Sequence, residues 1–267
     1  LDDIPQCHRL QSNPANSSSV SPHPNFIPFK STRNQTSPSI QRWSGYLTNQ
    51  MSVQPLQHLK DTQNDPDHRQ LPIDRVGIKG LRFPMRLKDK ADSEQHTVAT
   101  IALTVDLPAA LKGTHMSRFI EALHADGTQL HVDHIHALLT SLTQRLHSEC
   151  AHADFSFPFF REKKAPMSGK TGLLDYDVTL SATLLRGQFD FVTTLVVPVA
   201  TLCPCSKAIS DRGAHNQRGH VTFAVRTRTP IWMEDLIELV EQSASCELYS
   251  VLKRPDEKAV TERAYDN

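Results

Sequence analysis

The hydrophobic residues of this chain recur with two different periods, which divide it into expected strands and helices. In residues 101–107 apolar side chains alternate with smaller or polar ones, the period of a strand that buries one face. Apolar residues three or four positions apart then predict a helix over residues 116–123 and a longer helix over residues 132–146. Beyond these two helices the period returns to two.

Two alternating stretches in the second half of the chain predict a long hairpin. Residues 176–184 and 189–199 carry apolar side chains at every second position, and Arg186-Gly187 supplies the turn between them. A further strand is expected over residues 221–225, and a helix with one apolar stripe over residues 233–248. Consecutive strands with helices grouped between pairs of them predict an α+β fold, an antiparallel sheet with helices packed on one face.

The first seventy residues follow neither period. Residues 1–70 are rich in Ser, Asn, Gln, Pro and His, and their few large apolar residues have no regular spacing. Such a composition buries too little apolar surface to offset the entropy of ordering, so we predict a disordered N-terminal extension. The folded domain is expected to comprise residues 71–267.

Charge and cysteine content limit the expected partners and compartment. The chain has 29 basic and 29 acidic residues. A formal net charge of zero gives no global attraction to nucleic acid or to an anionic membrane, so any anion site must be local. Five cysteines without regular spacing argue against a disulfide framework and favour the reducing cytoplasm. No stretch approaches the ~18 apolar residues of a membrane-spanning helix, and we expect no membrane partner.

Reactive side chains are concentrated between two of the expected strands. Cys203, Cys205, His215 and His220 lie in a segment that we expect to be a loop held by the sheet. Thiolate and neutral imidazole are ligands that transition metals accept. The segment has neither a Cys-x-x-Cys pair nor the His-x-Glu signature of zinc deaminases. Spacing alone therefore leaves open whether Cys203 is a metal ligand or an inert buried residue.

Several motifs, read together, resemble one enzyme family. Residues 203–207 read Cys-Pro-Cys-Ser-Lys, residues 213–218 read Gly-Ala-His-Asn-Gln-Arg, and residues 252–258 read Leu-Lys-Arg-Pro-Asp-Glu-Lys. Supporting stretches are residues 112–119, 157–161 and 174–178. In these motifs, which follow in order through residues 71–267, the chain is similar to the type IB GTP cyclohydrolase I family.

The resemblance implies a fold, a reaction and a set of site residues. The implied fold is the tunnelling fold, in which subunits associate into a homo-oligomer, a dimer or a tetramer, with active sites where subunits meet. The implied reaction is hydrolysis of GTP to formate and 7,8-dihydroneopterin triphosphate, the first step of folate and pterin synthesis. Position by position, Cys203 and His215 are the implied catalytic residues, and Cys203, Glu257 and His215 the implied ligands of a divalent zinc, manganese or iron ion. By itself, Glu257 reads as a charged loop residue.

The triphosphate of GTP requires a local group of cations in a protein without net charge. We expect Lys112, Arg118, Arg161 and Arg218 to bind it, since guanidinium groups grip phosphate oxygens in pairs. On composition alone, a basic run such as residues 161–164 is more often a solvated charge cluster than a phosphate site.

Two other functions remain open at this point. A related tunnelling-fold purine or pterin enzyme would use Cys203 or Cys205 as a nucleophile without a metal. A non-catalytic purine-binding protein would bind GTP and leave C8 intact. A bound divalent ion that is lost in Cys203→Ala would argue against the first alternative, and the presence of both Cys203 and Glu257 counts against the second.

The printed sequence ends at Asn267, before the family pattern supplies a further strand, a glutamate for the guanine base and another active-site histidine. We therefore expect residues 1–267, expressed alone, to have an incomplete sheet and little activity. Robust formate release by this piece would contradict that expectation.

Overall fold

The computed structural model describes residues 61–63, 65–91, 93–125, 128–214, 216–227, 229 and 231–267. A disordered extension was predicted over residues 1–70, and residues 1–60 of it lie outside the described residues. Of the remainder, Pro66 forms an isolated bridge with Leu111, and the carbonyl of Asp65 accepts a hydrogen bond from the backbone N–H of Lys112 at 3.1 Å. These few residues run along the loop that follows the second strand of the sheet.

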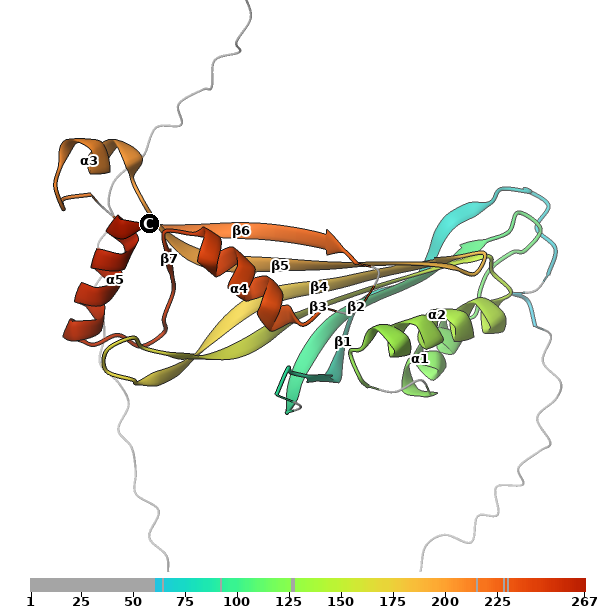
Figure 1. Ribbon diagram of the computed structural model, residues 1–267. Helices are drawn as coiled ribbons and strands as arrows, with labels where there is room; N and C mark the ends of the chain where they lie inside the picture. Colours follow the sequence, from blue (N-terminus) through green and yellow to red (C-terminus); the bar gives the residue numbers. More distant parts are fainter. Residues whose placement is uncertain are drawn as a thin grey trace, which may run out of the picture. The chain divides into compact units, whose positions relative to one another are not determined.

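The centre of the fold is an antiparallel sheet whose main strands lie side by side in chain order. Arg186 and Gly187 form a two-residue turn between the fourth and fifth strands, with φ of 48° and 81°. Positive φ at both positions suits the twist of a tight hairpin, which confirms the predicted one. The strands are β1 (Ile73–Lys88), β2 (Glu94–Leu107), β3 (Cys150–Lys164), β4 (Thr171–Leu185), β5 (Gln188–Leu202), β6 (Asn216–Arg226) and the short β7 (Cys246–Glu247), which pairs with β5 (Figure 1).

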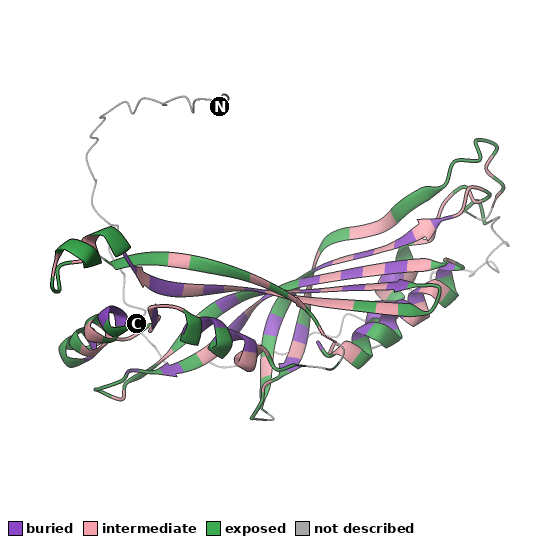
Figure 2. Cartoon of the chain, turned by 45° about the horizontal axis from the view of Figure 1, so that its top comes forward, coloured by how far each residue is buried: buried purple, intermediate pink, exposed green. Residues whose placement is uncertain are grey.

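The helices of the core cover one face of this sheet. Buried side chains alternate with partly exposed ones along β2 to β5, and the buried set packs against helices (Figure 2). Phe155 of β3, Leu139 and Ile237 belong to this core and are at most 1% exposed. The predicted α+β architecture is thus confirmed, and it is consistent with a tunnelling fold. The helices are α1 (Met116–Ala125), α2 (Val132–Leu146), α3 (Pro204–Ile209), α4 (Met233–Ser243) and α5 (Arg254–Asp266).

Several elements differ from the sequence-based expectation. β1 was not predicted, because a bulge at Gly80, with φ of 76°, and Pro84 interrupt its alternation. α4 ends at Ser243 rather than near residue 248, because Cys246 and Glu247 leave the helix to pair with β5. β3 was also missed, and the helices α3 and α5 replace expected loops.

None of the helices in the described part of the chain is both long enough and apolar enough to cross a membrane.

Candidate functional site

Cys203 lies where β5 passes into α3. It is the residue that caps α3, and Pro204 occupies the first helical turn, where its missing N–H is of no consequence. The carbonyl of Cys203 accepts a hydrogen bond from the backbone N–H of Lys207 at 3.0 Å. Cys203 is half-buried, while Cys205, in α3, is exposed, and neither forms a disulfide. Cys203 is therefore placed by the end of an interior strand rather than by a long loop.

The chain returns from α3 to the sheet directly beside Cys203. Leu202, the last residue of β5, pairs with Asn216, the first residue of β6. His215 lies outside the described residues, so its predicted role stays a prediction. Its covalent neighbours are described, and the backbone N–H of Ala214 donates a hydrogen bond to the hydroxyl of Tyr265.

Glu257 lies in the first part of α5, and its neighbour Asp256 fixes this helix. The carboxylate of Asp256 accepts hydrogen bonds from the backbone N–H groups of Lys253 at 2.8 Å, Met167 at 2.8 Å and Ser168 at 2.7 Å. Burial acts to raise the pKa of Asp256, but these hydrogen bonds outweigh it and hold the pKa below its usual range. Asp256, for which the motif suggested no role, thus caps α5 and ties it to the β3–β4 connection.

The opposite end of α5 meets the segment that carries Cys203. Tyr265 and Leu202 are members of one small buried cluster, completed by Ala200, Cys246 and Ala264. The side chain of Glu257 is exposed and shares a surface pocket with Arg212 and Tyr265. Eight residues of helix separate Glu257 from Tyr265, about 12 Å along the axis. α5 therefore contacts the Cys203 segment through its last turns and carries Glu257 two turns away.

A metal site requires donor side chains of suitable chemistry that lie close together. Within the described ranges, which leave out His215, no three His, Cys, Asp or Glu side chains gather closely enough to hold a metal ion. A thiolate, an imidazole and a carboxylate form a mixed donor set that suits zinc, iron or manganese. By donor chemistry the residues fit a divalent cation, and their convergence stays a prediction.

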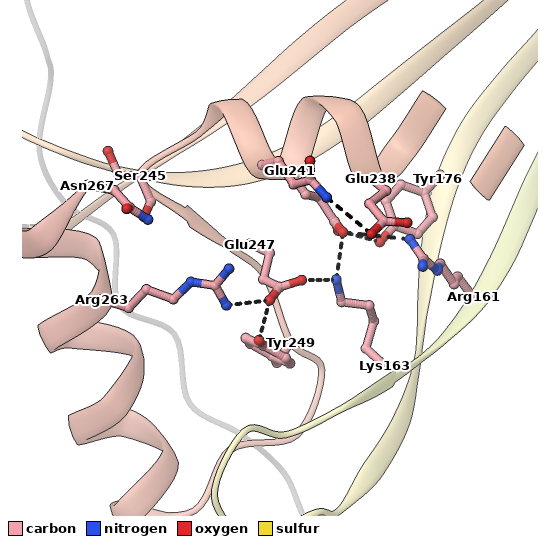
Figure 3. A network of polar contacts seen from close by, with 11 residues as sticks. Arg161, Lys163, Tyr176, Glu238, Glu241, Ser245, Glu247, Tyr249, Arg263 and Asn267 are labelled. Carbon is pink, nitrogen blue, oxygen red and sulfur yellow. Dashed lines mark hydrogen bonds and ion pairs between the residues drawn. The ribbon is translucent and has the colours of Figure 1, made fainter. Parts of the chain in front are cut away.

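A buried polar network fastens α4 and α5 to the sheet (Figure 3). The ammonium of Lys163 lies 2.7 Å from the carboxylate of Glu241 and 2.5 Å from that of Glu247. The hydroxyl of Tyr176 donates to Glu241 at 2.9 Å, and the guanidinium of Arg263 donates to Glu247 at 2.8 Å. Because the members come from β3, β4, α4, β7 and α5, no sequence spacing indicates the network.

Glu247 makes the stability of this network depend on pH. Burial acts to raise the pKa of Glu247, but hydrogen bonds from Lys163 and Tyr249, together with the charges of Lys163 and Arg263, outweigh it and lower the pKa. A carboxyl with a lower pKa in the folded chain stabilises the fold above its unfolded pKa, and this stability is lost as the pH falls through the folded pKa.

We therefore expect Glu247→Gln to be less stable than wild type at pH 7, and the difference to narrow as the pH falls below the ordinary value of 4.5. Urea unfolding of both proteins between pH 7 and pH 3 measures the difference. A gap that stays constant across this range would show that the charge of Glu247 does not stabilise the fold.

Two of the four predicted phosphate ligands lie toward the Cys203 end of the sheet. Arg218 is exposed on β6, where it pairs with Ala200. Arg161 lies on β3, and its guanidinium is 3.8 Å from the carboxylate of Glu241. Arg218 is thus open to a ligand, while Arg161 borders the buried network.

The other two lie at the opposite end of the sheet. Lys112 is in the loop after β2, and the guanidinium of Arg118 donates to the carbonyl of Arg145 at 2.7 Å, in the last turn of α2. A cation is favourable at that position because helix carbonyls point toward it. β5 spans the sheet from Gln188 to Leu202, about 45 Å at ~3.3 Å per residue. Within one chain, Lys112 and Arg118 are therefore too far from Cys203 to share its ligand.

Comparison with known proteins gives a consistent set of relatives. Residues 59–267 match the family described as type I GTP cyclohydrolase folE2. GTP cyclohydrolase FolE2 of Akkermansia muciniphila is 56% identical over 215 residues, which are 79% of this chain and 81% of the relative. The protein of the same name from Methylobacillus flagellatus is 51% identical over 219 residues, which are 82% of this chain and 81% of the relative. The one from Thiobacillus denitrificans is 51% identical over 209 residues, which are 78% of this chain and 78% of the relative.

Proposed function

The chain belongs to the type I GTP cyclohydrolase FolE2 family, and from this membership we propose that it hydrolyses GTP to formate and 7,8-dihydroneopterin triphosphate. The observation that carries the proposal is the match over residues 59–267, which contains the motifs around Cys203 and Glu257. The reaction supplies the first intermediate of folate-type pterins. The finer assignment to the type IB subgroup and a cytoplasmic location are parts of the proposal. The first rests on the motifs, and the second on the described cysteines, which form no disulfide.

A divalent zinc, manganese or iron ion is the proposed cofactor, held by Cys203, Glu257 and His215. Support comes from the donor chemistry and from the β5–β6 pairing, which returns the chain to position 216 beside Leu202. When bound, such a cation supplies positive charge that makes a water molecule acidic enough to ionise near neutral pH. The thiolate of Cys203 would hold it from the junction of β5 and α3, and the carboxylate of Glu257 from α5, which the polar network fastens to the sheet.

His215 is the proposed carrier of protons. Addition of water to C8 of the purine and cleavage of the C–N bond both require a proton to move, and imidazole has an ordinary pKa near the working pH. Arg218, exposed on β6 three residues after His215 in the chain, is the proposed ligand of phosphate oxygens.

We also propose that the active enzyme is a homo-oligomer, a dimer or a tetramer, with sites between subunits. Lys112 and Arg118 lie at the end of the sheet away from Cys203, so they would serve a phosphate only across a subunit boundary. Among the described strands, β1 and β6 each pair on one side. Free strand edges of this kind favour association with another copy.

The test is turnover by protein expressed from its complete coding sequence. With Zn²⁺, Mn²⁺ or Fe²⁺ supplied in turn, we expect formate and dihydroneopterin triphosphate in equal amounts, loss of both after chelation, and recovery when metal returns. Turnover that survives complete metal removal and proceeds through a covalent adduct on Cys203 or Cys205 would indicate the nucleophilic alternative. GTP that binds and is recovered intact with every metal would indicate a non-catalytic binding protein.

A further inference from the structure

Tyr265 is linked to the residues that directly precede two predicted ligands. Its ring is 8% exposed and belongs to the same buried cluster as Leu202, which precedes Cys203. Its hydroxyl accepts a hydrogen bond from the backbone N–H of Ala214, which precedes His215. One side chain of α5 is therefore linked to the residue before Cys203 through a shared buried cluster, and to the residue before His215 through a hydrogen bond.

The segment that the hydroxyl of Tyr265 holds has few other anchors. Residues 211–213 are exposed. The ion pair from this segment to α5 joins Arg212 and Glu262 at 3.6 Å, with side chains 60% and 45% exposed. Exposed ion pairs contribute little to stability because water and salt screen them. The hydrogen bond from Ala214 to a largely buried hydroxyl is the stronger constraint on this segment.

α5 is itself a rigid support for Tyr265. Asp256 fixes its first turn, and Arg263, two residues before Tyr265, donates to Glu247 of the buried network. Glu257, on the same helix, lines one surface pocket together with Tyr265. A displacement of α5 would therefore move Glu257 and the Ala214 backbone together.

We propose that Tyr265 is a positioning residue that holds the segment ending at Ala214, directly before His215, against the helix that carries Glu257. The inference rests on the proposed metal site. Metal affinity depends on donors that are held in place before the ion arrives, and removing a supporting hydrogen bond typically weakens binding about 10- to 100-fold. Tyr265→Phe removes this hydrogen-bond acceptor and keeps the ring.

Cobalt(II) is the probe, because a thiolate ligand gives it a sulfur-to-metal charge-transfer band. Titration of the full-length protein against a competing chelator should show about 10-fold weaker binding or more for Tyr265→Phe, with a changed visible spectrum. Tyr176→Phe is the matched control. It also deletes a tyrosine hydroxyl in the fold, one that bonds to Glu241 and not to the Ala214 segment. Thermal unfolding of the variants separates a positioning effect from loss of the fold.

The outcomes distinguish the inference from the function on which it rests. A wild type without the thiolate band, or with a band that persists in Cys203→Ala, would overturn the proposed metal site itself. A wild type with the band, and a Tyr265→Phe variant with the same affinity and spectrum, would overturn the positioning role alone. Equal weakening in Tyr176→Phe would assign the effect to general stability and would also overturn it.

Hydrogen exchange gives a test that needs no variant. The amide of Ala214 should exchange slowly in the wild type, more slowly than the amides of the exposed residues 211 and 212; the amide of Gly213 is no reference, because it donates to the hydroxyl of Ser210 at 2.6 Å. An Ala214 amide that exchanges as fast as these neighbours would refute the hydrogen bond on which the inference depends.

Discussion

Replacing Cys203 with alanine is expected to remove the bound metal and to lower formate release from GTP by about 1,000-fold or more. A metal that polarises the attacking water contributes several kcal/mol to the reaction, and about 4 kcal/mol corresponds to 1,000-fold in rate. Loss of the thiolate removes one of the three proposed ligands. The remaining carboxylate and imidazole would hold zinc, iron or manganese weakly, so the metal content of the purified variant should fall together with its rate.

Cys205→Ala is the matched control for this prediction. Cys205 is exposed, lies two residues away in α3 and carries the same functional group, so a nonspecific effect of losing a thiol would appear there too. We expect Cys205→Ala to keep its metal and to react within a few-fold of the wild type. Metal analysis and initial rates measured side by side decide the question. Full activity in Cys203→Ala, or a loss confined to Cys205→Ala, would contradict the proposed ligand.

The largest expected effect on stability is that of Lys163→Met. The side chain of Lys163 is 7% exposed and bridges Glu241, 5% exposed, and Glu247, 20% exposed. Methionine keeps most of the length and packing but leaves two carboxylates without their shared cation. Removing one partner of a buried ion pair typically costs about 3–5 kcal/mol, because the other charge stays buried and uncompensated. We expect a decrease of this size in the free energy of unfolding at pH 7.

Lys164→Met is the control for Lys163→Met, since the neighbouring side chain points to the other face of β3 and is exposed. Its expected effect is within about 0.5 kcal/mol. Combining Lys163→Met with Glu247→Gln should recover part of the loss, because one of the two carboxylates that lost their lysine is then neutral, while Glu241 stays charged. Urea unfolding of the four proteins measures all these terms. Equal losses at positions 163 and 164 would show that the buried network does not stabilise the fold.

The sheet could be predicted where each strand carries its own pattern. The β4–β5 hairpin was predicted because apolar side chains alternate on both strands and Arg186-Gly187 suits the positive φ of the turn. α2 was predicted for the same kind of reason, since its buried residues recur at helical spacing. In these elements the local sequence and the environment provided by the fold agree.

α5 could not be predicted in this way. Its sequence, Arg254 to Asp266, is mostly polar and has no strong apolar stripe. Tertiary hydrogen bonds hold this helix in place. The backbone N–H groups of Met167 and Ser168 donate to the carboxylate of Asp256, and the guanidinium of Arg263 donates to the carboxylate of Glu247. Glu257 therefore read as a loop residue, while the structure places it on a helix that is fixed at both ends.

The candidate site also contains residues that the sequence indicated and residues that only the structure revealed. The motifs singled out Cys203, His215 and Glu257 through their resemblance to a known family, and the chemistry of a thiol, an imidazole and a carboxylate agrees with the implied metal site. They were not enough for Tyr265 or for Lys163, whose roles depend on partners 51 and 78 residues away. No spacing rule reports such pairs.

By itself, the sequence determined the order of the predicted strands and helices, which face of those elements is buried, and the kind of reactive groups between β5 and β6. These follow from side-chain chemistry and from periods of two and 3.6 residues, which are local properties. Only the tertiary structure decided that α5 lies against the end of β5, that Asp256 and Tyr265 fix it there, and that Lys112 and Arg118 lie at the far end of the sheet. Such arrangements depend on contacts between distant residues, and the free energy of those contacts exists only once the sheet has formed.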